Sequence, residues 1–389
     1  MALTGIRVLD LSRILAGPSA TQIFGDLGAD VVKVEKPGEG DDTRKWGPPY
    51  QKDDDGVETQ ESAYYLAANR NKRSIALDLG NPQDLAQIHK LLARADVLVE
   101  NYKVGGLAKY GLAYEQIKDR YPKLVYCSVT GFGQTGPYAK RPGYDFLIQG
   151  MGGIMSLTGD PDGIPMKVGV GIADVMTGMY AAVGILAALR HRDQTGLGQH
   201  IDISLLDTQI SWLVNAGTNY LMDRKVPQRL GNGHPNIVPY QVFNASDSPL
   251  ILAVGNDAQF RRFCEAAGLN ALADDPRFAT NVQRIANRNE VCDAIDASLK
   301  NRPRAEWLKE LEAVGVPCGP VNNLQDVFND PHVRERGSEL QMPCEWAEGG
   351  RISLLANPLK LSLTPPTYRM PPPRLNEHMD EVLADWLSN

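Results

Sequence analysis

The run IRVLDL at residues 6–11, a helical pattern over 18–27 and the run ADVVKVE at residues 29–35 decide the fold of this chain. Both runs are short, rich in β-branched residues and bounded by turn formers, a pattern that is typical of buried strands. A strand, a helix and a second strand in this order form a parallel βαβ unit. The unit predicts an α/β fold with helices on both faces of a parallel sheet.

The same alternation continues along the chain, and a different texture begins after Pro227. We expect further strands at 74–79, 97–100, 124–130 and 201–204, and helices at 82–94, 114–121, 177–190 and 206–222. Later elements are expected as two strand-like runs within 242–254, helices at 257–266, 287–300 and 304–313, a strand at 359–363 and a helix at 379–387. Together they predict a Rossmann-like, doubly wound large domain and a smaller α+β domain.

The length of 389 residues exceeds what a single hydrophobic core usually organises, so two domains are expected. We assign residues 1–205 to the large domain, 206–225 to a linker helix and 226–320 to the small domain. Residues 321–389 are expected to form a return linker and the C-terminal part of the large domain, which 335–389 complete.

Composition argues against several classes of protein. A net charge of −7 without a basic stripe disfavours a nucleic-acid partner. Five scattered cysteines without a C-x-x-C pair predict reduced thiols, and the histidines show no metal-ligand spacing, so no metal is expected. No signal peptide, transit peptide or membrane span is recognisable, which favours a cytoplasmic protein without a membrane partner.

The loop RILAGP at residues 13–18 follows the first strand and contains a single glycine. A dinucleotide site at this place needs G-x-G-x-x-G, and no P-loop motif occurs elsewhere in the chain. A nicotinamide-dependent oxidoreductase is therefore kept only as an alternative, because a Rossmann-like fold does not by itself imply NAD binding.

The run GVGIADVMTGMY at residues 169–180 holds the strongest candidate for chemistry. Asp174 lies where a helix rich in small residues begins, among free backbone N–H groups. An aspartate in this place is ordinarily a helix cap, but it can also be a nucleophile that a substrate approaches past the glycines. No G-x-S-x-G elbow or Cys–His pattern supplies a competing nucleophile. The residues alone leave both roles of Asp174 open.

Cations gather in segments that precede or follow the expected strands. They are Lys33, Lys36, Arg44, Arg70, Lys72, Arg73, Lys103, Lys109, Lys140 and Arg141. Loops beyond the carboxyl ends of parallel strands converge on the ligand crevice, so the pattern favours a flexible phosphorylated ligand. Ordinary solvated surface charge is the alternative.

Several motifs resemble, in the right order, those of a known family. They are VLDLSR at 8–13 with AGP at 16–18, GADVVKVE at 28–35, NKRSI at 71–75, VENY at 99–102, GFGQTGP at 131–137, ADVMTG at 173–178 and VPCGPV at 316–321. Through them the chain resembles, nearly end to end, the family III CoA-transferases (CaiB/BaiF family), which include formyl-CoA and carnitine CoA-transferases and acyl-CoA racemases. The runs TRKWGPP at 43–49 and GNGHPNIVPY at 231–240 resemble the branch with the succinyl-CoA:glutarate CoA-transferases.

The resemblance implies that Asp174 attacks an acyl-CoA thioester and carries CoA as an aspartyl-CoA thioester before a carboxylic acid takes it over. It implies an acyl-CoA and a carboxylic acid as substrates, no cofactor beyond the CoA thioester itself, and an interlocked homodimer whose linkers are 206–222 and 316–321. Backbone N–H groups at the start of the helix are expected to stabilise the oxyanions. The implied CoA contacts are Leu15, Ala16, Lys36, Leu77, Asp78, Gly80, Asn101, Tyr102, Lys109, Tyr144 and Asp145.

Two alternatives stay within reach of the same site. Tyr144 stands where the racemases carry a histidine base, so transfer is favoured over racemisation; a non-catalytic acyl-CoA-binding protein is the second alternative. We expect succinyl-CoA as the donor and a small dicarboxylic acid such as glutarate as the acceptor. The second carboxylate of that acid needs a cation, and we assign Arg70 with help from His234. The alternative for Arg70 is a structural salt bridge.

Overall fold

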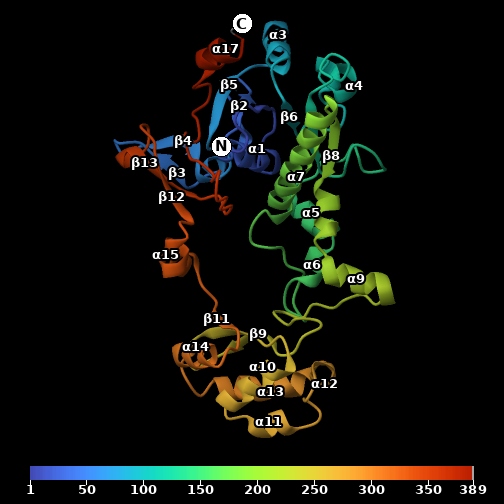
Figure 1. The fold of residues 1–389 in the computed structure, drawn as a ribbon, viewed down its shortest axis with the longest axis vertical. Coiled ribbons are helices and arrows are strands. Elements are labelled where there is room, and N and C mark those ends of the chain that lie inside the picture. Colours follow the sequence, from blue (N-terminus) through green and yellow to red (C-terminus); the bar gives the residue numbers. More distant parts are fainter. Residues whose placement is uncertain (388–389) are drawn as a thin grey trace. The chain divides into compact units, whose positions relative to one another are not determined.

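A parallel sheet of six strands forms the centre of the first of two compact units in the computed structural model, which describes residues 1–387 (Figure 1). The strands lie in the order β5-β2-β1-β6-β7-β8, and every neighbouring pair is parallel. Their bounds are β1 Arg7–Asp10, β2 Asp30–Glu35, β5 Lys72–Ala76, β6 Val97–Glu100, β7 Val125–Thr130 and β8 His200–Ser204. This is the strand order of a doubly wound Rossmann sheet, with its reversal point between β1 and β6.

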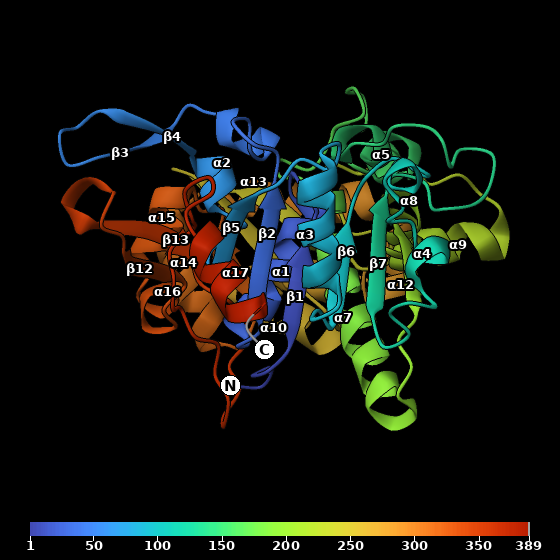
Figure 2. The same ribbon diagram turned by 90° about the horizontal axis from the view of Figure 1, so that it is seen from above.

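Helices cover both faces of the sheet. One face carries α1 (Ala16–Asp26), α5 (Asp145–Met151), α7 (Ile172–Thr195) and α8 (Leu205–Ser211), and the other carries α3 (Pro82–Leu92), α4 (Tyr114–Ile117) and α17 (Met379–Leu387). Figure 2 shows α3 and α17 on one side of the strands and α1 on the other. Successive strand residues serve opposite faces, so that Val8 joins one core and Leu9 the other. The predicted α/β class with a central parallel sheet is confirmed.

The first unit also contains two short antiparallel hairpins outside the sheet. They consist of β3 (Tyr50–Lys52) with β4 (Glu58–Ser62) and of β12 (Glu339–Pro343) with β13 (Arg351–Leu355). The short helices α2 (Ala63–Leu66) and α16 (Pro331–Glu335) and the 3₁₀ turns Asp42–Lys45, Ala108–Tyr110 and Glu348–Gly350 complete it. Neither hairpin was expected from the sequence, because their strands are only three to five residues long.

The second unit comprises residues Met155–Met166 and Asn215–Asp330. Its antiparallel sheet has the order β11-β10-β9, formed by Cys318–Pro320, Pro249–Ala253 and Tyr240–Asn244. Helices pack around Trp307, Phe260 and Phe263 in its core. The helices of this unit are α9 (Val214–Asp223), α10 (Asp257–Ala266), α11 (Asn270–Asp274), α12 (Asn281–Ala286), α13 (Arg288–Leu299), α14 (Arg304–Ala313) and α15 (Leu324–Asn329), and α6 (Ile154–Leu157) includes the last residue of the first unit before the chain enters the second.

Several expected elements differ in the structure. The single helix expected at 206–222 is two helices, α8 and α9, with a break that begins at Trp212. Val214, the first residue of α9, has a positive φ. The run at 359–363 forms no strand, and α4 ends at Ile117 rather than at residue 121. The second unit starts at Asn215 and also takes residues 155–166, which the sequence placed in the large domain.

Helix α7 is 24 residues long, and it crosses α1 closely at Gly178. A Cβ atom at Gly178 would lie 2.7 Å from the carbonyl oxygen of Ala16 and 3.1 Å from Cβ of Ser19. Within residues 1–387, α7 alone is long and apolar enough to cross a membrane by length and composition, a test that buried core helices also pass. It packs against α1, β7 and β8, with Ala181, Ile185 and Ala188 in the core.

We predict that Gly178→Ala is less stable than the matched variant Gly184→Ala by about 1–3 kcal/mol in the free energy of unfolding. Both substitutions gain about 1 kcal/mol of helix propensity, but only Gly178 has backbone in the way, whereas a Cβ at Gly184 meets the Ile201 side chain at 3.4 Å. Urea denaturation of the two variants measures the difference. Equal midpoints with equal slopes would show that the α1–α7 crossing is not close.

Candidate active site

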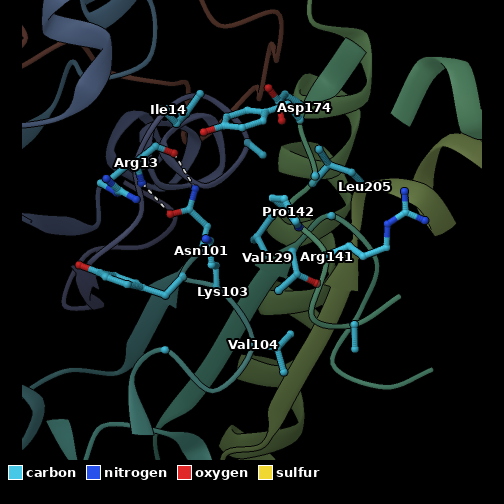
Figure 3. A pocket seen from close by; sticks show the side chains of 18 of the residues that line it. Arg13, Ile14, Asn101, Lys103, Val104, Val129, Arg141, Pro142, Asp174 and Leu205 are labelled. Carbon is cyan, nitrogen blue, oxygen red and sulfur yellow. Dashed lines mark hydrogen bonds between the residues drawn. The ribbon is translucent and has the colours of Figure 1, made fainter. Parts of the chain in front are cut away.

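A cavity of about 370 Å³ opens at the carboxyl ends of the central strands of the first unit. Its walls come from the loops that follow β1, β6 and β7 and from the first turn of α7 (Figure 3). The cavity therefore lies at the reversal point of strand order between β1 and β6, where doubly wound sheets bind their ligands. It is lined by Arg13, Ile14, Ala16, Asp42, Asn101, Tyr102, Lys103, Val104, Gly106, Lys109, Tyr110, Val129, Thr130, Gly131, Ala139, Arg141, Pro142, Gly143, Tyr144, Asp174 and Leu205.

Asn101 ties together the two loops that flank the reversal point. Its Oδ1 accepts a hydrogen bond from the backbone N–H of Arg13 at 2.9 Å, and its Nδ2 donates to the carbonyl of Arg13 at 2.7 Å (Figure 3). Both polar atoms of the amide are thus used by one backbone unit, as in a strand pair. The amide of Asn101 therefore fixes the width of the cavity at this point.

The loop after β1 is held in a strained shape by a buried ion pair. Ile14 has φ of 71°, an uncommon conformation for a β-branched residue, and its N–H donates to the Asp41 carboxylate at 3.2 Å. Lys33 Nζ donates to Asp41 at 2.9 Å and to the carbonyl of Ser12 at 2.8 Å. Burial opposes ionisation of Asp41, but Lys33 and Thr43 outweigh it and lower its pKa to about 2. The loop is thereby preorganised before any ligand binds.

Asp174 is the third residue of α7, and it does not cap the helix. The residue that caps α7 is Asp145, whose Oδ1 accepts the N–H groups of Ala173 at 2.8 Å and of Asp174 at 3.4 Å. Gln149 donates to the other oxygen of Asp145 at 2.7 Å and so holds it in place. The capping role left open by the sequence therefore belongs to Asp145, and the Asp174 carboxylate lines the cavity.

The contacts at the start of α7 also correct the expectation that its backbone N–H groups stabilise oxyanions. The N–H groups at the start of α7 are already engaged, since Ile172 donates to the carbonyl of Val170 at 2.8 Å and Ala173 and Asp174 donate to Asp145. They are not available to stabilise oxyanions, as the sequence suggested. The effect of Asp145 on Asp174 is instead electrostatic.

The pKa of Asp174 is raised to about 7, first by burial and then by repulsion from Asp145. Its side chain has no hydrogen-bond partner within residues 1–387, although the residue is only 9% exposed. The pKa of nearby Tyr64 is raised to about 12 by burial, by Asp174 and by Asp145. A buried carboxylate without donors is a strong base and a strong nucleophile once it is ionised.

The structure brings six of the predicted site residues into the cavity wall: Asp174, Ala16, Asn101, Tyr102, Lys109 and Tyr144. Leu15 lies beside them, with a methyl group 3.3 Å from the position of a Cβ on Gly171. Asp145 contacts the start of α7 instead of the cavity.

The other predicted CoA contacts belong to the loops after β2 and β5. Lys36 is exposed and paired with Glu39 at 2.5 Å, Leu77 is buried, and Asp78 accepts a hydrogen bond from Gly80. The pKa of Lys36 is raised chiefly by Glu39. Roles of Lys36, Leu77, Asp78 and Gly80 in CoA binding stay predictions.

Arg70 is not placed as an acceptor ligand. Its Nε and Nη2 donate to the Asp26 carboxylate at 2.9 and 2.6 Å, and Nη1 donates to the carbonyl of Leu355 at 2.8 Å. The guanidinium is buried and does not line the cavity. The structural salt bridge, the alternative for Arg70, is what the structure shows. His234 belongs to the second unit, where its Nδ1 accepts the N–H of Asn236 at 3.0 Å, and its acceptor role stays a prediction.

Several lining residues received no role from the sequence. Arg13 pairs with Asp42 at 2.8 Å, and Lys103 and Arg141 add cations to the wall. In the sequence, only the clustering of cations after the expected strands pointed to these residues. The clustering indicated the correct edge of the sheet, but it did not show which of the cations line the cavity. Ile14 gave no signal, because a positive φ at isoleucine cannot be inferred from its neighbours.

Comparison with known proteins is consistent along the whole chain. The model of CoA-transferase family III matches residues 3–379. The chain is 51% identical over 383 residues to a succinate–glutarate CoA-transferase of Agrobacterium fabrum, covering 98% of this chain and 95% of that protein. It is 42% identical over 385 residues to a succinyl-CoA:glutarate CoA-transferase of Mus musculus, covering 99% of this chain and 86% of that one.

A solved structure shows the same fold. The crystal structure of a CaiB/BaiF family protein from Brucella suis superposes with a TM-score of 0.87 at 47% identity, and the match covers 99% of both chains. These matches cover nearly the whole chain, so almost all of the described fold is shared with the family. The chain therefore belongs to CoA-transferase family III and is an enzyme that transfers CoA.

Proposed function

We propose that this enzyme moves CoA from succinyl-CoA to glutarate, or to a dicarboxylic acid of similar size, through an aspartyl-CoA thioester on Asp174. The observation that carries the mechanism is the buried Asp174 carboxylate, which lines the cavity without a hydrogen-bond partner in the described chain and has a pKa raised to about 7. The substrates are supported by the names of the relatives from Agrobacterium fabrum and Mus musculus.

The transfer divides into four exchanges at carbonyl carbon. An oxygen of Asp174 attacks the thioester of succinyl-CoA, the C–S bond breaks, and an anhydride and the CoA thiolate result. The thiolate attacks the aspartyl carbonyl and releases succinate. Glutarate then displaces the thiolate from the aspartyl-CoA thioester to give a second anhydride. Attack of the thiolate on the glutaryl carbonyl forms glutaryl-CoA and returns the Asp174 carboxylate, with no net consumption of water or protons.

The surroundings of Asp174 favour its covalent forms over its ionised form. Burial and the charge of Asp145 both penalise a second carboxylate at this place. Acylation converts the Asp174 carboxylate into a neutral anhydride or thioester, and the penalty disappears. The free carboxylate is thus destabilised relative to the intermediate, which helps a thioester exchange whose overall free energy change is small.

Cations of the wall suit the phosphates of CoA and the free carboxylates of the acids. Arg13, Lys103, Lys109 and Arg141 all line the cavity that Asp174 enters. Arg13 is already paired with Asp42, so Lys103, Lys109 and Arg141 are the stronger candidates for contact with an anionic ligand. CoA enters as a substrate, and the proposal needs no resident cofactor. The five free cysteines are compatible with the cytoplasmic location expected from the sequence.

The racemase alternative has no support from the wall of the cavity. Removal of an α-proton needs a base of suitable pKa beside the acyl group. Tyr144 occupies the place of the racemase histidine, and no histidine is among the described residues that line the cavity. We therefore keep transfer as the single proposed reaction.

We further propose that two copies of the chain form a homodimer. Helix α7 exposes Met179, Tyr180, Val183 and Leu186, each at least 39% exposed, on the side opposite its core residues. A row of large apolar side chains on one helix is typical of a protein–protein interface. A second copy is the proposed occupant, in line with the interlocked dimer that the family resemblance implies.

Mixing the protein with succinyl-CoA is predicted to add the mass of CoA less one water to the peptide that contains Asp174, because the aspartyl-CoA thioester accumulates until an acceptor arrives. Mass spectrometry of the quenched protein detects it, and glutarate should clear it with formation of glutaryl-CoA. Asp174→Ala should carry no adduct and lose transfer by a factor of about 10³ or more, whereas Asp42→Asn, from the same wall, should still be labelled. An adduct on Asp174→Ala would refute the assignment.

The pH dependence of kcat/KM for succinyl-CoA is predicted to follow ionisation of Asp174. Below its pKa of about 7 Asp174 is protonated and cannot attack, so the rate falls as the pH is lowered through that value. Asp145→Asn removes the repelling charge and keeps an oxygen for the N–H of Ala173, so the midpoint should move to lower pH. Asp42→Asn serves as the control, with an unchanged midpoint. Identical midpoints for wild type and Asp145→Asn would contradict the electrostatic account.

Analytical ultracentrifugation is predicted to give twice the chain mass of 42.6 kDa. Val183→Glu should shift the population toward the monomer, because it buries a charge in the proposed interface. Val282→Glu replaces a valine of the second unit that is 76% exposed, and it should leave the mass unchanged. A monomeric wild-type protein at micromolar concentration would overturn the proposed dimer.

A further inference from the structure

Three polar side chains outside the cavity, two of them buried and the third half-buried, form a row across three adjacent strands. Glu100 ends β6, Ser128 lies opposite it on β7, and His200 begins β8. Ser128 faces Glu100 in the register of the two strands and lowers the pKa of its carboxyl, and the Ser128 hydroxyl oxygen lies 2.9 Å from Nε2 of His200. The Ser128 hydroxyl and Nε2 of His200 are thus within hydrogen-bond distance of one another.

The row ends on the backbone of the loop after β6. Glu100 Oε2 accepts the N–H of Tyr102 at 2.8 Å, which fixes the turn that the chain makes as it leaves the strand. This loop supplies Asn101, Tyr102, Lys103, Val104, Gly106, Lys109 and Tyr110 to the cavity of Asp174, more residues than any other segment. Figure 3 shows Asn101, Lys103 and Val104 along one side of that cavity.

Glu100 is held by hydrogen bonds alone. It is 5% exposed, and no ion pair is formed by it within residues 1–387. Burial raises its pKa to about 7, against the lowering effect of Ser128 and of the Tyr102 N–H. His200 is held in turn by Tyr114, whose ring stacks on it with centroids 4.8 Å apart. A buried carboxylate without a cation depends strongly on each of its donors.

A second cavity, of about 320 Å³, lies on the other side of the same loop. Glu100, Ser128 and His200 line it together with Tyr114 and Glu115 of α4, Gly105, Leu107, Ala113, Tyr126 and Gln134. Lys103 and Val104 line both cavities, so this part of the loop is a wall between them. The loop packs on the core through Leu107, Tyr102 and Tyr110, and the hydrogen bond from the Tyr102 N–H to Glu100 adds a restraint at the point where the chain leaves β6.

We propose that Glu100, Ser128 and His200 are positioning residues, which hold the loop 101–110 in the place where it binds the acyl-CoA. None of the three lines the cavity of Asp174, so each acts only through the loop. The role in acyl-CoA binding rests on the proposed function, whereas the hold on the loop does not. Loss of one donor lets the loop leave the wall, and the binding of acyl-CoA weakens while the chemistry at Asp174 proceeds as before.

The test compares Ser128→Ala and His200→Phe with the wild type and with Ser74→Ala. Ser74 is an equally buried serine of the same sheet that donates to Glu35 at 2.6 Å, but Glu35 also has two bonds from Arg44 and keeps its partners. Amide hydrogen exchange of residues 101–110 is measured on the free protein. We expect exchange at the Tyr102 amide to rise at least about tenfold in Ser128→Ala and His200→Phe, and to stay unchanged in Ser74→Ala.

Kinetics supply the second readout. The KM for succinyl-CoA should rise about tenfold in Ser128→Ala with kcat changed less than about threefold, whereas a variant that is merely less stable loses active protein and lowers kcat alone. Unchanged exchange of the loop overturns the positioning role whether or not the enzyme is active. Faster exchange with an unchanged KM overturns it as well. A wild type that does not react with succinyl-CoA refutes the proposed substrate, and the exchange data still decide whether the row holds the loop.

Discussion

The bond between the Asp145 carboxylate and the first N–H groups of α7 is the constraint on which the site depends. A long helix needs its N-terminal N–H groups satisfied, and an aspartate in the first turn is the ordinary means. Asp145 satisfies them from another segment, with Oδ1 2.8 Å from the N–H of Ala173. Asp174 is thereby released from capping, and it faces a carboxylate instead of a donor. One contact thus leaves the nucleophile available and adds to burial, which is the main cause of its raised pKa.

Hydrogen-bonded polar groups fix the shape of the loops around Asp174. Lys33 and Asp41, both fully buried, hold the strained loop at Ile14, and Asn101 joins that loop to the one after β6. Buried ion pairs of this kind contribute little net stability compared with apolar replacements, because desolvation offsets the attraction. Their value here is geometric, since the first loop keeps its shape without a ligand and less conformational freedom is lost when CoA binds.

The sequence predicted the features that depend on neighbouring residues, and it missed contacts between residues that are distant in the chain. Helices 257–266, 304–313 and 379–387 were predicted to the residue, because apolar periodicity and caps are local. The parallel sheet with helices on both faces followed from the βαβ alternation. Arg70 was misjudged because its partner, Asp26, lies 44 residues away, and the cap of α7 was missed because Asp145 lies 28 residues from Ala173. No local pattern records such pairs, so their chemistry emerges only when the sheet is assembled.

Glu100 and Asp174 show why a raised pKa does not identify a nucleophile. Both carboxyls are buried in the same unit, and burial is the chief cause that raises the pKa of each to about 7. Their surroundings differ in the donors that they meet. Glu100 accepts a hydrogen bond from the N–H of Tyr102, Ser128 also lowers its pKa, and it does not line the cavity of Asp174. Asp174 meets no donor in the described chain and lines that cavity. The side chain that can attack a substrate is the one whose oxygens are free, and the assignment of Asp174 rests on that difference rather than on its pKa.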